Sequence, residues 1–177
     1  THNTFEAGRL AGVKRMIFAS TTPTLHGHTI RPTPETLDPD KKVRLELLDA
    51  PNPDSFYAVS KLLGENLGRL YFEKHGIEFV GMRIGWLIQE NDPSTKVGTS
   101  AEDYMRAMWL SRSDALLIFH AACLTPNLPA AWPESPTGPH GVAFAISAGG
   151  WSGLPLDPRQ TGELLLTSAQ SLLAALL

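Results

Sequence analysis

Cysteine, long apolar runs and an excess of positive charge are scarce or missing in this sequence of 177 residues. The one cysteine, Cys123, excludes an internal disulfide and is typical of a reducing compartment. No apolar stretch approaches the roughly 18 residues that a membrane-spanning helix needs, and the first residues lack the pattern of a signal peptide. A net charge of -3 argues against nucleic-acid binding. We therefore expect a cytoplasmic protein with no membrane segment and no nucleic-acid partner.

Charged residues are scarce in the last third of the chain. Residues 124–177 contain four charged side chains but seven of the 14 prolines, and proline is tolerated neither inside helices nor in central strands. We expect a Pro-rich loop there, together with one strand over residues 142–147 and a terminal helix over residues 164–177. The chain thus divides near Cys123 into two parts of different composition.

The first 123 residues show helix and strand patterns in alternation. Helical spacing of apolar residues predicts a long helix that begins at Asp54 or Ser55 and ends at His75, before Gly76. The same rules predict helices over residues 3–11, 100–109 and 113–123 and strands over residues 13–20 and 77–84, with a loop over residues 21–52. Because strands alternate with helices, we predict an α/β fold with a parallel sheet.

Tyr57 and Lys61 lie four residues apart in the long helix, so they share one face. A phenol has a pKa of about 10, and a neighbouring ammonium favours its ionised form. Such a pair can take a proton from an alcohol while a hydride leaves the alcohol carbon. Ser20, Thr21 and Thr22 end the first strand, where open α/β sheets bind ligands. We expect one of these three hydroxyls to bond the reacting oxygen.

Three segments, taken together, resemble one enzyme family. They are V-K-R-M-I-F-A-S-T at residues 13–21, S-F-Y-A-V-S-K-L-L-G-E at residues 55–65 and M-R-I-G at residues 82–85. This combination resembles the extended short-chain dehydrogenase/reductase superfamily, the NAD-dependent epimerase/dehydratase family. Residues 103–114, D-Y-M-R-A-M-W-L-S-R-S-D, are similar to a segment of the uronate dehydrogenases and related NAD-dependent sugar or sugar-phosphate dehydrogenases.

The resemblance implies a fold and a division of the chain. Residues 1–123 would form a partial NAD(P)-binding Rossmann-like domain, the C-terminal half of the family's parallel sheet, and would contain the catalytic Tyr-Lys helix. Residues 124–177 would form the Pro-rich loop, one strand and the terminal helix. Because helices equivalent to the Tyr-Lys helix often form dimer interfaces in this superfamily, the resemblance also implies a homodimer.

The resemblance further implies a role for individual residues. Tyr57 would be the general base, and Lys61 would lower its pKa and bind the nicotinamide ribose. Thr21 would be the catalytic hydroxyl residue, with Ser20 and Thr22 as close alternatives. The implied cofactor-binding residues are Ser20, Tyr57, Lys61, Ile84 and Gly85, and the implied substrate-binding residues are Thr21, Thr22 and Arg106. Arg106 would contact an anionic group of a sugar or sugar acid, whose hydroxyl is oxidised with NAD.

Several family features are absent from the sequence. It contains no Gly-x-x-Gly-x-x-Gly turn to hold a pyrophosphate and no acidic reader of the adenine ribose, so NAD and NADP both remain open. The bulky Trp86 stands where the family usually has a small polar residue. Two alternatives therefore stay open: a nucleotide-sugar epimerase or dehydratase, and a catalytically silent, N-terminally truncated fragment that acts by binding a partner.

Other conspicuous residues have simpler interpretations. His26 and His28 have no third ligand at a suitable spacing, so we assign no metal. We expect Cys123, at the end of an apolar helix, to be a small buried residue. Glu65 continues the face of Tyr57 and Lys61, and we interpret it as a structural partner of that face.

Overall fold

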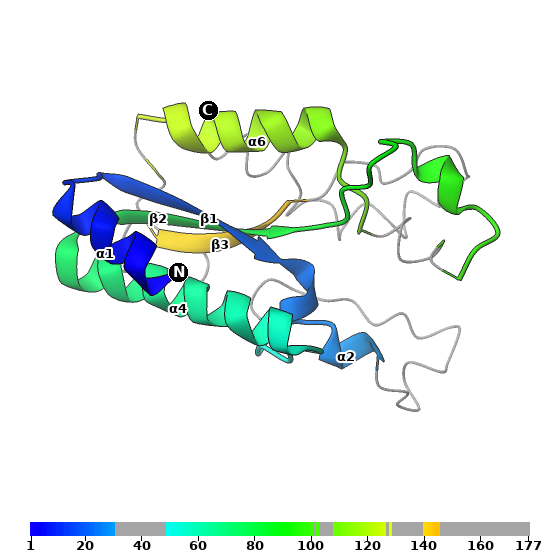
Figure 1. Ribbon diagram of the computed structural model, residues 1–177, viewed down its shortest axis with the longest axis horizontal. Coiled ribbons are helices and arrows are strands. Elements are labelled where there is room, and N and C mark those ends of the chain that lie inside the picture. The colour runs from blue at the N-terminus through cyan, green and yellow to red at the C-terminus, as the bar shows by residue number, and fades with distance from the viewer. Residues whose placement is uncertain (31–48, 101, 103–107, 127, 129–139, 146–177) are drawn as a thin grey trace.

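The computed structural model is built around a parallel sheet of three strands, β1 (Arg15–Thr21), β2 (Glu78–Ile84) and β3 (His140–Ala145), in the order β1-β2-β3. It describes residues 1–30, 49–100, 102, 108–126, 128 and 140–145. Figure 1 shows α1 (His2–Leu10) and α4 (Phe56–His75) on one side of the sheet and α6 (Arg112–Leu124) on the other. This layered arrangement is the predicted α/β fold.

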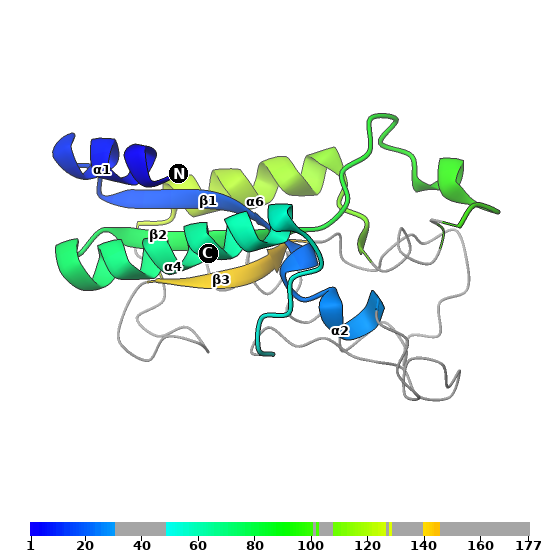
Figure 2. The ribbon, with the colours of Figure 1, turned by 60° about the horizontal axis from the view of Figure 1, so that its bottom comes forward.

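Each face of the sheet has its own apolar core, because side chains alternate along a strand. Figure 2, turned by 60°, shows α4 running along the strands on its face of the sheet. On that side, α1 and α4 pack on the sheet through Phe5, Tyr71 and Phe79. On the other side, α6 packs through Ile118, Ala121 and Ala122 against alternate residues of β2. The following core residues of that second side come from β2 and the segment before α6: Val80, Met82 and Leu110.

Glycines let α4 approach the sheet closely. A methyl group added at Gly64 would overlap the ring of Phe18, and one added at Gly68 would overlap the ring of Phe79. Glycine inside a helix costs about 1 kcal/mol relative to alanine, so close packing against Phe18 and Phe79, and not helix propensity, explains glycine at these two positions. The short distance between α4 and β1 places the start of α4 beside the carboxyl end of β1.

The predicted ends of the long helix are confirmed. Ser55 is the N-cap of α4, and Gly76 follows its last residue in the left-handed conformation, with φ +66°. The helix predicted over residues 3–11 is α1, followed by the left-handed Gly12. The three strands are also observed, each shifted by one or two residues from its predicted limits.

Three other predictions of local structure need correction. Residues 21–52 are not all loop, since η1 (Thr22–Thr24) and α2 (Gly27–Ile30) lie within their described part. The helix predicted over residues 113–123 begins at Arg112, because Ser111 rather than Ser113 accepts the capping bond from the Asp114 amide. Cys123 is exposed rather than buried, because it lies on the solvent side of the last turn of α6.

Two predicted segments fall largely outside the described residues. These are the helix over residues 100–109 and the terminal helix over residues 164–177. Because most of residues 124–177 lie there too, the division of the chain at residue 123 stays a prediction. A further short helix, η2 (Pro93–Lys96), follows β2. Within the described part of the chain, no helix is both long and apolar enough to cross a membrane.

Candidate active site

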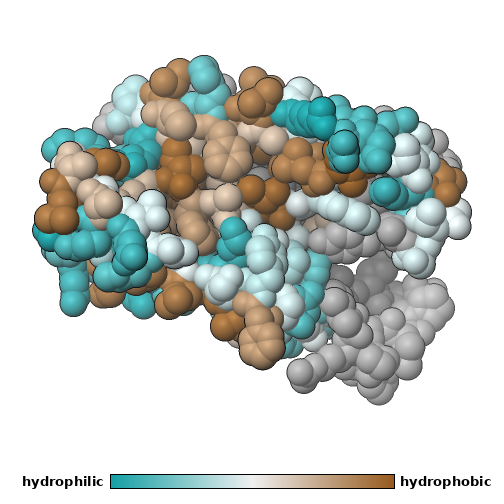
Figure 3. All heavy atoms as spheres, in the orientation of Figure 1, coloured by the Kyte–Doolittle hydropathy of each residue, from teal (hydrophilic) through white to brown (hydrophobic). Residues whose placement is uncertain are grey.

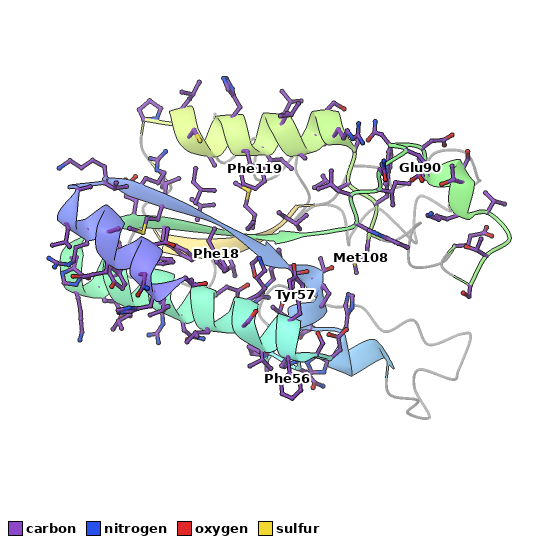
Figure 4. The ribbon with its side chains drawn as sticks, in the orientation of Figure 1. Phe18, Phe56, Tyr57, Glu90, Met108 and Phe119 are labelled. Carbon is purple, nitrogen blue, oxygen red and sulfur yellow. The ribbon has the colours of Figure 1, made fainter. Side chains whose placement is uncertain are left out.

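Tyr57 and Lys61 lie one turn apart near the start of α4. Ser55 fixes this end of the helix, since its side chain accepts a hydrogen bond from the Ala58 amide over 3.2 Å. Figure 4 shows Tyr57 on the side of α4 that faces the end of β1, whereas Phe56 points away from the sheet. Tyr57 is 55% exposed, so a ligand can approach its ring and hydroxyl.

Lys61 joins the helix to the carboxyl end of β1. Its Nζ donates a hydrogen bond to the carbonyl oxygen of Ala19 over 2.6 Å. The same nitrogen lies 5.4 Å from the centre of the Tyr57 ring and 5.3 Å from that of the Phe18 ring. The ammonium and the phenol therefore share one face of α4, as the spacing of four predicted.

The three hydroxyl residues that end the first strand are buried but differ in their partners. Ser20 donates its hydroxyl hydrogen to Oε1 of Glu65. The hydroxyl of Thr21 makes no hydrogen bond to any residue that the structure describes, while its carbonyl oxygen accepts one from Thr24 Oγ1 over 2.9 Å. Thr22 begins η1. The hydroxyl hydrogen of Ser20 is thus held by Glu65, whereas the hydroxyl of Thr21 has no hydrogen-bond partner among the described residues.

Glu65 forms a buried ion pair with Arg83 of β2. Arg83 Nε and Nη2 donate to the two carboxylate oxygens of Glu65 over 3.0 and 2.9 Å, and the two side chains are only 5% and 8% exposed. Glu65 therefore has structural partners in both strands, Ser20 in β1 and Arg83 in β2. No role was predicted for Arg83, although an arginine that follows a run of buried apolar residues in a strand is a signal for a buried acidic partner.

The carboxyl end of β2 lies beside that of β1. Ile84 is paired in register with Thr21, and both Ile84 and Gly85 are half-buried. The next residue, Trp86, forms a parallel bridge with Trp109, in which the Trp86 amide donates to the Met108 carbonyl oxygen over 2.6 Å. The predicted substrate residue Arg106 lies outside the described residues.

Two histidines follow the hydroxyl residues in the chain. Burial lowers the pKa of His26, and the nearby Asp54 carboxylate opposes this shift only in part. Nε2 of His28 lies 2.7 Å from the carbonyl oxygen of Ala50. Within the described ranges, no group of three or more His, Cys, Asp or Glu side chains is placed to hold a metal ion. His26 and His28 thus each contact a residue of the segment just before α4, namely Asp54 and Ala50.

The model of the NAD dependent epimerase/dehydratase family matches residues 1–121. The chain belongs to this family. One curated relative, the L-arabinose 1-dehydrogenase (NAD(P)(+)) of Haloferax volcanii, is 41% identical over 118 residues, which make up 64% of this chain and 46% of the relative. The uronate dehydrogenase of Agrobacterium fabrum is 34% identical over 136 residues, 76% of this chain and 44% of the relative.

A solved structure of the glucuronic acid dehydrogenase from Chromohalobacter salexigens superposes with a TM-score of 0.60 at 28% identity. The alignment covers 85% of this chain and 45% of that one. The chain spans less than half the length of the curated relatives it matches. The matched residues 1–121 include Tyr57, Lys61 and the three hydroxyl residues at the end of the first strand.

Proposed function

We propose that this chain carries the catalytic part of an NAD-dependent sugar dehydrogenase. The observation that carries the proposal is the meeting of Tyr57 and Lys61 with the end of β1, where Lys61 Nζ binds the Ala19 carbonyl oxygen. Because the curated relatives described above are dehydrogenases, oxidation of a sugar or sugar acid is preferred to nucleotide-sugar epimerisation.

In this proposal Tyr57 accepts the proton of the sugar hydroxyl. The ammonium of Lys61 lies near the phenol ring and would stabilise the negative charge that develops on its oxygen. Thr21 would donate a hydrogen bond to the reacting oxygen, because its hydroxyl has no partner among the described residues while that of Ser20 is bound to Glu65. Arg106 would bind an anionic group of the substrate.

The residues at this end of the sheet suit a nicotinamide ring. Ile84 offers an apolar side chain, and Gly85 has no side chain to obstruct a flat ring; both are half-buried at the carboxyl end of β2. Lys61 would hold the adjoining ribose. The bound NAD would supply the hydride acceptor, and NADP would serve the same chemistry. Since the sequence holds no glycine-rich pyrophosphate turn, this chain would contribute the nicotinamide side of the site.

A second candidate function rests on the free edge of β1. Within the described part of the sheet, β1 pairs with β2 alone. Beside it lies an apolar hollow of about 440 Å³, and Figure 3 shows hydrophobic side chains gathered across this face. Parallel strands are usually covered on both faces and edges. A catalytically silent chain could therefore act by binding a partner here. The apolar residues that line the hollow are Phe5, Val13, Met16, Ile17 and Phe18.

The proposal also includes a homodimer and a cytoplasmic location. The dimer would form through the outer face of α4, which carries the exposed apolar residues Phe56, Val59 and Leu63. Helices pack against each other through such spaced apolar side chains.

Calorimetric titration of NAD into the chain, after circular dichroism has shown that it is folded, separates the two candidate functions. Binding would favour the dehydrogenase and lead directly to turnover measurements with L-arabinose, glucuronate and a sugar phosphate. The same measurements should be made on a fusion protein. In this fusion, the part of the Haloferax volcanii L-arabinose 1-dehydrogenase that precedes its aligned region is joined to Thr1 of this chain. If the folded chain binds no NAD and the fusion produces no reduced nicotinamide, the dehydrogenase proposal is wrong.

A further inference from the structure

The buried carboxylate of Glu65 joins three elements of the fold at one point. It belongs to α4, it accepts the hydroxyl hydrogen of Ser20 in β1, and it accepts two hydrogen bonds from Arg83 in β2. Ser20 and Arg83 are direct partners in the register of the two strands. This junction lies one residue before the last residue of each strand, at the edge that carries the candidate active site.

Stability alone does not account for a charged junction at this place. Removing two charges from water costs several kcal/mol per ion, and replacing a buried ion pair by apolar side chains of similar size is often neutral or stabilising. The ion pair instead fixes the relative position of the two side chains, because the arginine guanidinium binds a carboxylate through two parallel hydrogen bonds. The same carboxylate also accepts, at Oε1, the hydroxyl hydrogen of Ser20.

The junction and Lys61 act on consecutive residues of β1. Lys61, one turn before Glu65 on the same face of α4, binds the carbonyl oxygen of Ala19, and Glu65 binds the side chain of Ser20. The next residue is Thr21, the proposed catalytic hydroxyl. Fixing Ser20 therefore fixes both the acceptor that holds the Lys61 ammonium and the backbone that carries Thr21.

We propose that Glu65 and Arg83 are positioning residues, which act through Ser20 to hold the Lys61 ammonium and Thr21 in place beside Tyr57. Neither residue touches the reacting atoms in this scheme. The inference rests on the proposed function for its catalytic consequence, but its structural consequence, the placement of Lys61, can be measured without turnover.

The decisive variant replaces both charges by apolar side chains, Glu65→Leu with Arg83→Met. Nuclear magnetic resonance of the chain reports the ammonium nitrogen of Lys61, whose hydrogens stay visible while they are held in a hydrogen bond. We expect the double variant to remain folded and to lose this signal. The matched control is Glu73→Leu with Arg69→Met, an exposed ion pair of the same helix, which should leave the Lys61 signal unchanged.

Ser20→Ala provides a second, milder variant in case the apolar pair prevents folding. It keeps the ion pair and removes only the hydroxyl link, so the Lys61 signal should again weaken. An unchanged Lys61 signal in either folded variant would overturn the inference.

If the fusion protein described above oxidises a sugar, its kinetic constants provide a separate measurement. The folded double variant should lose up to about a hundredfold in kcat, as expected for misplaced catalytic groups, while KM for NAD changes little. Absence of turnover in the parent would count against the proposed function, and the Lys61 signal would still decide the role of Glu65 and Arg83.

Discussion

Nδ1 of His26 lies 3.3 Å from a carboxylate oxygen of Asp54, the residue before the N-cap of α4. His26 belongs to the segment that follows η1 and is 6% exposed. The contact therefore ties the chain beyond the hydroxyl residues of β1 to the beginning of the helix that carries Tyr57. Through this link, we expect the protonation of the buried His26 imidazole to change the stability of the region around the candidate site.

Acid should destabilise the fold through His26. Burial lowers its pKa below the usual 6.5, so the unfolded chain takes up a proton at a higher pH than the folded chain does. The contribution to the free energy of unfolding is fully present above pH 6.5 and is lost as the pH falls through the lowered pKa. Urea unfolding at a series of pH values measures this slope.

In the variant His26→Gln, the free energy of unfolding should depend less steeply on pH just below pH 6.5, because the titrating imidazole is gone. The matched change at the exposed Asn66 of α4, Asn66→Gln, replaces one uncharged amide by another and should leave the slope of the parent. A His26→Gln variant with the full slope would show that another group is responsible.

Gly68→Ala should destabilise the chain although alanine favours helices. The added methyl group would meet the buried ring of Phe79, and overpacking of this kind outweighs the gain in helix propensity, for a net loss of roughly 1–2 kcal/mol. Asn66→Ala, on the exposed side of the same helix, carries no such clash and should change stability by less than about 0.5 kcal/mol. Equal effects of the two changes in urea unfolding would contradict this account.

The local signals of the sequence were sufficient to predict α4 and the helix face that Tyr57 and Lys61 share. Ser55 and Gly76 limit the helix through their own side-chain and backbone chemistry, and the spacing of Tyr57 and Lys61 follows from helix geometry alone. These features depend on residues close in the chain, which is why the pattern predicted them.

Contacts between distant segments could not be predicted in the same way. Ser20, Thr21 and Thr22 look alike in sequence, and only the approach of Glu65 from another element distinguishes Ser20 from Thr21. The exposure of Cys123 likewise depends on which side of α6 faces the sheet, and an apolar helix of this length does not reveal that side by periodicity.

Arg15→Met should loosen α6 at its carboxyl end. The guanidinium binds the carboxylate of Glu78 over 2.7 Å and also donates to the carbonyl oxygens of Ala122 and Thr125 over 2.8 and 2.7 Å. Losing hydrogen bonds from a charged group costs about 2 kcal/mol. Hydrogen exchange of the last turn of α6 should accelerate together with the loss in urea stability, whereas Arg69→Met, from an exposed pair, should cost less than about 0.5 kcal/mol. Unchanged exchange in α6 would exclude Arg15 as its anchor.

The outer face of α4 should mediate self-association. Phe56 is 95% exposed and Leu63 59% exposed, and together with Val59 and Leu70 they recur at intervals of three, four and seven residues along one side of the helix. Two copies of α4 packed side by side would cover these residues from water.

Leu63→Lys should convert the dimer to a monomer in sedimentation equilibrium. The change places a charge where the two helices would meet, and the unpaired buried charge should weaken association by at least about tenfold. Leu116→Lys is the matched control, because Leu116 is similarly exposed but lies on α6, and it should leave the dimer intact. Dissociation by both changes would point to a loss of folding instead. A parent chain that sediments as a monomer at every concentration would refute the α4 interface, and with it the homodimer.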